Sequence, residues 1–91
     1  MAELHFTSHL KRFFPALENG LVLEAASVAS LLVALDARHP GLRGYLVDDQ
    51  GALRQHVNIF VGARPVSDRA ALTDPLAPGD RVHILQALSG G

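Results

Sequence analysis

The feature that most constrains the fold is one amphipathic helical pattern between stretches that alternate as β-strands do. Its apolar residues follow the i, i+3, i+4, i+7 spacing of a buried helical face: Val28, Leu31, Leu32 and Leu35. Ser27 stands before them as an N-cap, and Pro40 ends the pattern because the residue before a proline avoids the helical region. We therefore expect one main helix, from about Val28 to Arg38, packed on a sheet.

Two strands are expected before this helix. Residues 3–7 alternate, with Leu4 and Phe6 on one face, and residues 21–25 form a second apolar stretch. Asn19-Gly20 is a strong turn signal before the second stretch. We expect the two strands to be antiparallel.

The remaining connections are interpreted as loops and turns. Residues 8–20 are expected to form a loop whose Phe13 and Phe14 cap the core. Residues 41–54 are interpreted as a small hairpin, because Asp48–Gly51 has the acidic, glycine-closed composition of a turn.

Residues 56–61 give the clearest strand signal, and the last strand is expected over 81–87. In the first of these strands, the core face takes Val57, Ile59 and Val61, and the other face takes Asn58 and Phe60. In the last strand, Val82 and Ile84 point inward, and His83 and Leu85 point outward. Between the two strands we expect a short edge strand over 64–66 and a helical turn over 67–72.

Composition fits one globular domain. The chain has 91 residues, is 48% hydrophobic, contains no cysteine and carries a formal net charge of −1. A net charge this small provides no long-range attraction for nucleic acid or an anionic membrane. The absence of cysteine excludes thiolate chemistry in this chain. The N-terminal residues lack the pattern of a signal peptide, and no apolar stretch is long enough to span a bilayer. We expect an α+β domain, soluble and cytoplasmic, with a mixed sheet of four or five strands.

The chain ends on two glycines. Residues 1–87 are expected to form the domain, and a flexible tail follows: Leu88, Ser89, Gly90 and Gly91. Without a Cβ, a glycine tail can pass through a narrow channel in an extended form. The terminal carboxylate is ionised at neutral pH.

Several pieces together resemble the MoaD/ThiS group of sulfur carriers, which have the ubiquitin-like β-grasp fold. The matching pieces are residues 57–62, Asp74-Pro75-Leu76, residues 78–84 and the terminal Gly90-Gly91. Gly62-Ala63 stands where many members have Asn-Gly, which alters turn chemistry only. The resemblance implies a β-grasp sheet that clasps the helix at residues 28–38.

The resemblance also implies a chemistry in which this chain is a carrier and not an enzyme. A ubiquitin-activating-type enzyme would join the carboxylate of Gly91 to AMP, using ATP that the enzyme itself binds. A sulfurtransferase would then supply persulfide sulfur, and the resulting thiocarboxylate would donate sulfide to a biosynthetic enzyme. Two alternatives remain open: a protein modifier joined through Gly91 to a lysine, and an interaction module with an inert tail. No cofactor is expected on the chain itself.

The expected docking face for these partners consists of Phe60, Leu85, His83 and Arg81. Apolar anchors of this kind dominate interfaces; the alternative is that a loop covers them. The five histidines do not follow a metal-binding spacing, so no metal site is expected. Asp48 and Asp49 are interpreted as turn residues and not as an acid–base pair, and Ser89 has no context for a nucleophile.

Overall fold

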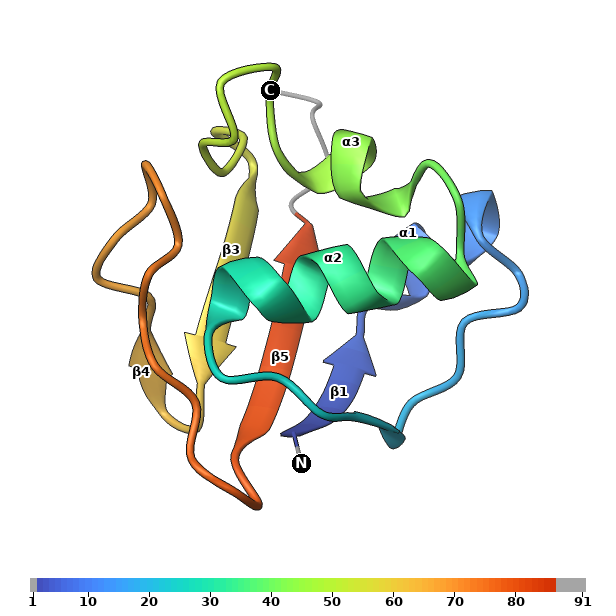
Figure 1. Cartoon of the computed structure of the whole chain (residues 1–91). Coiled ribbons are helices and arrows are strands. Elements are labelled where there is room, and N and C mark those ends of the chain that lie inside the picture. The colour runs from blue at the N-terminus through green and yellow to red at the C-terminus, as the bar shows by residue number, and fades with distance from the viewer. Residues whose placement is uncertain (1, 87–91) are drawn as a thin grey trace.

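The structure, a computed structural model, describes residues 2–86, except for the side chains of Ser8, His9 and Phe13. A five-stranded mixed sheet lies behind a helix that crosses it (Figure 1). Along the sheet the order is β2 (Leu21–Leu23), β1 (Ala2–Phe6), β5 (Arg81–Gln86), β3 (Val57–Val61) and β4 (Arg64–Pro65). β1 and β5 are parallel at the centre, and the other pairs are antiparallel. The expected α+β class and mixed sheet are confirmed.

Alternation along the strands places one row of side chains in the core. In β3, Val57, Ile59 and Val61 are buried, while Asn58 is exposed and Phe60 half-buried. In β5, Val82 and Ile84 are fully buried. The facing expected from the sequence is therefore confirmed for both strands, because neighbouring residues of a strand point to opposite faces.

The main helix, α2 (Val28–Arg38), covers the inner face of the sheet (Figure 1). Ser27 forms a capping box: its Oγ accepts from the N–H of Ser30 at 3.2 Å, and the Oγ of Ser30 accepts from the N–H of Ser27 at 3.1 Å. The buried residues of the helix are the four that the spacing predicts: Val28, Leu31, Leu32 and Leu35. The start, the bounds and the buried face of this helix are confirmed.

A loop before β5 completes the cap of α2. The N–H of Val28 donates to the carbonyl of Asp74 at 3.0 Å, and that of Ala29 donates to the carbonyl of Leu72 at 2.9 Å. These bonds satisfy helix-end donors that have no intrahelical partner. Leu72 adopts a φ of 54°, in the left-handed region, with its side chain buried. The expected helical turn before it is a single turn, in which the N–H of Leu72 donates to the carbonyl of Asp68.

Two carboxylates hold this loop together. Asp74 accepts hydrogen bonds from the N–H groups of Ser67 and Asp68, both at 2.9 Å. Asp68 accepts from the hydroxyl of Thr73 at 2.6 Å and from backbone N–H groups. The Thr73 hydroxyl is the main cause that lowers the pKa of Asp68, and the N–H of Ser67 is the main cause that lowers the pKa of Asp74.

The interpretation of residues 8–20 as a loop throughout is wrong, because Ser8–Phe13 form a short helix, α1. Its Leu10 is fully buried, so tertiary packing stabilises a helix too short to be stable alone. Phe14 does pack against the core, edge-to-face with Tyr45 at 5.8 Å. The Phe13 side chain lies outside the described part. The second strand is also shorter than expected and ends at Leu23.

The predicted hairpin over residues 41–54 is also wrong in its first half, where Leu42–Leu46 form helix α3. The Asp36 carboxylate, at the end of α2, accepts from the N–H groups of Gly41 and Arg43 at 3.1 and 3.0 Å. Asp36 thus caps the start of α3 from the preceding helix, and the composition of residues 41–54 does not reveal this contact. Only one bridge of the hairpin, Val47 to Leu53, is present.

We expect Leu35→Ala to lower the free energy of unfolding by about 2–5 kcal/mol, because it leaves a cavity in the core. Val33→Ala is the matched control: Val33 is 58% exposed on the same helix, so its truncation should change stability by less than about 0.5 kcal/mol. Urea unfolding measures both. Equal costs would mean that α2 packs through a different face.

Acid should weaken the loop around Asp68 and Asp74. Lowered pKa values mean that the folded state favours ionised carboxylates. This contribution to stability is fully present above the unfolded pKa of about 3.9 and is lost as the pH falls through the lowered values. In urea unfolding across this pH range, the D68N/D74N variant should lose stability less steeply than the parent chain. Asp49→Asn serves as the control and should keep the parent slope; an unchanged slope in D68N/D74N would refute the assignment.

Candidate functional site

The face of the sheet opposite α2 carries the side chains expected to bind partners. We call it the outer face. Its members follow from the strand registers, in which Glu3 pairs with both Val22 and Arg81, His83 pairs with both His5 and Phe60, and Leu85 pairs with Asn58. The outer face is thus a continuous surface across β2, β1, β5 and β3.

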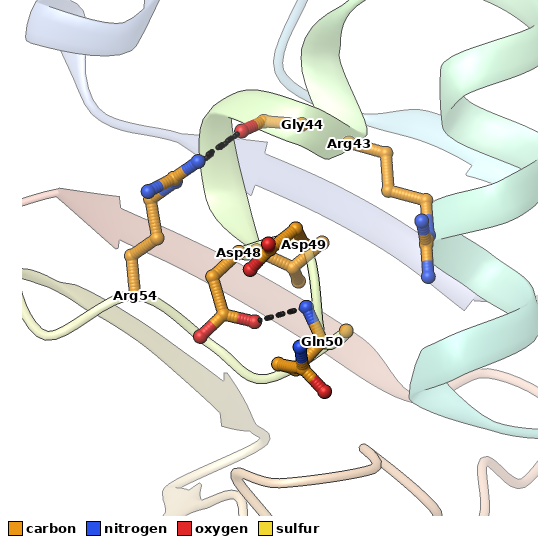
Figure 2. A pocket seen from close by; sticks show the side chains of 8 residues that line it. Arg43, Gly44, Asp48, Asp49, Gln50 and Arg54 are labelled. Atoms are coloured by element: carbon orange, nitrogen blue, oxygen red, sulfur yellow. Dashed lines mark hydrogen bonds between the residues drawn. The ribbon is translucent and has the colours of Figure 1, made fainter.

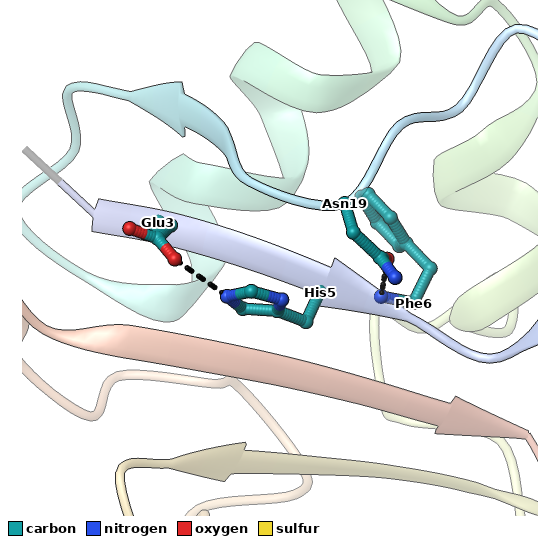
Figure 3. Close-up of polar contacts among 4 residues, drawn as sticks. All are labelled: Glu3, His5, Phe6 and Asn19. Atoms are coloured by element: carbon teal, nitrogen blue, oxygen red, sulfur yellow. Dashed lines mark hydrogen bonds and ion pairs between the residues drawn. The ribbon is translucent and has the colours of Figure 1, made fainter.

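Two histidines form the centre of the outer face. The rings of His5 and His83 stack with centroids 5.0 Å apart and planes inclined by 20°. His5 Nε2 lies 2.7 Å from Glu3 Oε1, and both side chains belong to β1 (Figure 3). At the end of β1, the N–H of Phe6 donates to Asn19 Oδ1 at 2.8 Å (Figure 3). This bond ties the connection between β1 and β2 to the end of β1.

The structure brings the four expected docking residues together on this face. Leu85 is 37% exposed, Arg81 is exposed, and Phe60 and His83 are half-buried as a cross-strand pair. Within residues 2–86, no loop covers Leu85 or Arg81, so the alternative of a covered patch does not apply to these two. The geometry shows their clustering; their role as a docking face remains a prediction.

Sequence reasoning missed Glu3 and His5 as members of this cluster. Both occupy outward positions of β1, whereas Leu4 and Phe6 face the core. The alternation of residues 3–7 already indicated these outward positions. What placed them beside His83 is the parallel pairing of β1 with β5.

The tail residues Leu88, Ser89, Gly90 and Gly91 lie outside the described part of the chain, as does the predicted boundary at residue 87. The described chain ends with Gln86, the last residue of β5. Since β5 lies between β1 and β3, the chain approaches its terminus from the central strand of the sheet.

A shallow polar hollow lies away from the outer face, around the turn after α3 (Figure 2). Asp48 accepts from the N–H groups of Gln50 and Ala52 at 2.8 and 3.0 Å, and the Arg54 guanidinium donates to the Gly44 carbonyl. Asp48 therefore acts as a turn residue, as predicted. Nothing in this arrangement resembles a catalytic set.

No three His, Cys, Asp or Glu side chains within residues 2–86 gather as a metal-binding group. None of the helices in this part of the chain is long and apolar enough to cross a membrane.

Known proteins are similar to this chain in both sequence and architecture. Residues 9–91 match the model of the ThiS family. Small archaeal modifier protein 3 of Haloferax volcanii is 33% identical over 66 residues, which cover 72% of this chain and 71% of that protein.

Solved structures agree with the fold. A chain of the BexX/CysO complex from Amycolatopsis orientalis superposes with a TM-score of 0.84 at 22% identity and full coverage of both chains. SAMP1 from Haloferax volcanii superposes with a TM-score of 0.74 at 27% identity, covering 99% of this chain and 98% of that one. The expected ubiquitin-like β-grasp fold is confirmed.

The outward position of Leu85 can be tested by charge. Leu85→Asp should leave the fold intact, with a change in stability within about 1 kcal/mol, because water already reaches this side chain. Ile84→Asp, the control, places a carboxylate in the core and should abolish cooperative unfolding. Thermal unfolding followed by circular dichroism distinguishes them. Loss of the fold in Leu85→Asp would show that Leu85 belongs to the core.

Proposed function

Because the chain belongs to the ThiS family, we propose that it is a sulfur carrier whose terminal Gly91 becomes a thiocarboxylate. The observation that carries this proposal is the family match, which runs from residue 9 to residue 91 and so includes Gly90 and Gly91. The β-grasp architecture supports it, since the working group is then a tail that leaves a compact domain.

The chemistry begins with activation of a poor electrophile. An oxygen of the Gly91 carboxylate attacks the α-phosphorus of ATP, pyrophosphate leaves, and an acyl-adenylate forms. Persulfide sulfur of a sulfurtransferase attacks the carbonyl carbon, and AMP leaves with the bonding electrons. A thiol then attacks the sulfur–sulfur bond, which releases the Gly91 thiocarboxylate and leaves a disulfide on the transferase.

In this scheme the chain itself supplies a substrate and a docking face. ATP is bound by the activating enzyme, and the chain holds no cofactor. The outer face provides the contact, with Leu85 and Phe60 as apolar anchors and Arg81 and His83 as polar ones. The exposure of Leu85 beside Phe60 supports this assignment, because clustered apolar side chains at the surface mark interaction sites, whereas single ones do not.

A second candidate is a protein modifier, in which a lysine amine attacks the activated carbonyl and an isopeptide bond forms. It is supported by the 33% identity to small archaeal modifier protein 3. Both candidates share the adenylation step and differ only in the acceptor. An interaction module with an inert tail would show no adenylation at all.

Deletion of Gly91 should abolish ATP-dependent release of pyrophosphate by the activating enzyme, because adenylation expels pyrophosphate, and it should leave folding unchanged. The new carboxylate would lie about 3.5 Å short of the phosphate, far outside near-attack geometry. One residue added after Gly91 should have the same effect.

Ser89→Ala preserves the length and is the control, with activity expected near that of the parent chain. Intact mass then identifies the product: exchange of one oxygen for sulfur supports the carrier, and a conjugated protein supports the modifier. Full adenylation of the shortened or extended chain would contradict the role of Gly91.

A further inference from the structure

A second hollow adjoins the one around the turn after α3, and the two share Asp48 and Arg54. It is open to solvent and measures about 600 Å³, within the range of sites that bind small molecules. Three of its side chains are basic, and among the described residues that line it only Asp48 carries a negative charge. We call it the arginine hollow; its lining residues are Asp48, Leu53, Arg54, Gln55, His56 and Arg69.

Neutral oxygen atoms hold the two arginines of this hollow in place. Arg54 donates from Nε and Nη2 to the carbonyl of Gly44 at 3.2 and 3.0 Å (Figure 2). Arg69 donates from Nη2 to the carbonyls of Arg54 and Val57 at 2.8 and 3.0 Å. Its Nη1 donates to Asn58 Oδ1 at 3.2 Å. Both guanidiniums are therefore oriented before any ligand arrives, which lowers the entropic cost of binding one.

The positive charges of these two arginines are not neutralised by the described part of the chain. Within residues 2–86, neither Arg54 nor Arg69 takes part in an ion pair. Asp48 Oδ1 instead accepts from the N–H groups of Gln50 and Ala52. Arg54 Nη1 and Arg69 Nε have no acceptor among the described residues. Two cations with free donors in one hollow favour an anion, because an anion offsets their mutual repulsion.

We propose that the arginine hollow binds a phosphate group, which accepts hydrogen bonds from Arg54 and Arg69 at the same time. A carboxylate has only two oxygens, and a single guanidinium fork satisfies both. A phosphate group offers at least three, so it can bridge two guanidiniums and still accept from Gln55 or His56. The Asp48 carboxylate repels the ligand and limits its affinity. The site uses no residue of the tail or of the outer face, so the proposal is independent of the proposed function.

The test titrates the full chain, labelled with nitrogen-15, with inorganic phosphate that replaces chloride at constant ionic strength. The Nε–Hε signals of Arg54 and Arg69 should shift along a saturating curve, with a dissociation constant on the order of 1 mM for so small an ion. Acetate should bind about threefold more weakly, because it cannot bridge both guanidiniums. AMP carries phosphate on a nucleoside: tighter binding of AMP would assign the site to a phosphate on a larger molecule, and equal or weaker binding to the free ion.

Variants separate charge from geometry. Arg54→Gln should weaken phosphate binding about tenfold, because a hydrogen bond between charged groups is lost. Arg54→Lys keeps the charge but loses the planar fork, and should weaken binding about threefold. Asp48→Asn keeps an oxygen for the turn and removes the repelling charge, so binding should tighten about two- to fivefold. Arg38→Gln is the matched control: Arg38 is exposed on α2 and does not line the hollow, so its loss should change affinity less than about twofold.

Three results would each overturn the proposal: shifts that rise without saturation, equal affinities for acetate and phosphate, or an Arg54→Gln affinity equal to that of Arg38→Gln. Thermal unfolding of every variant checks that it is folded. It also gives a second measurement of binding, because phosphate should raise the unfolding temperature of the parent chain more than that of Arg54→Gln.

Discussion

The parallel pairing of the first and last strands is the contact on which the rest of the structure depends. β1 and β5 are far apart in the chain, yet they pair from Glu3–Arg81 to Phe6–Ile84 at the centre of the sheet. A parallel pair needs a long connection, and here that connection supplies α2, which buries the inner face. The same pairing brings His5 to His83. The pairing of β1 with β5 therefore organises both the core and the outer face.

The elements with strong local signals were predictable. Ser27 and the apolar spacing behind it specified α2, and alternation specified the facing of β3 and β5. The short helices α1 and α3 were not predictable, because contacts outside each helix stabilise them: Leu10 is buried in the core, and Asp36 of α2 caps the start of α3. The residues of the candidate site likewise fall into those that local patterns predicted and those that they did not. Alternation identified His83 and Leu85 as outward residues, but no local pattern revealed the stack of His5 on His83.

Asp74, one of the residues that resemble the family, has a structural role in the loop before β5. Asp74 holds Ser67 and Asp68 by its carboxylate and accepts from Val28 by its carbonyl. One residue therefore links the loop, the start of the main helix and the approach to the last strand. The family motif at this position therefore meets a requirement of the fold.

The central position of β5 has a mechanical consequence. A force applied at Gln86 along the axis of β5 loads this strand along its length. β5 is bonded to β1 on one side and to β3 on the other, so the load falls on both rows of hydrogen bonds in shear. An edge strand such as β4 would instead peel away one bond at a time. Pairing on both sides therefore makes β5 more resistant to a pull applied at Gln86 than an edge strand would be.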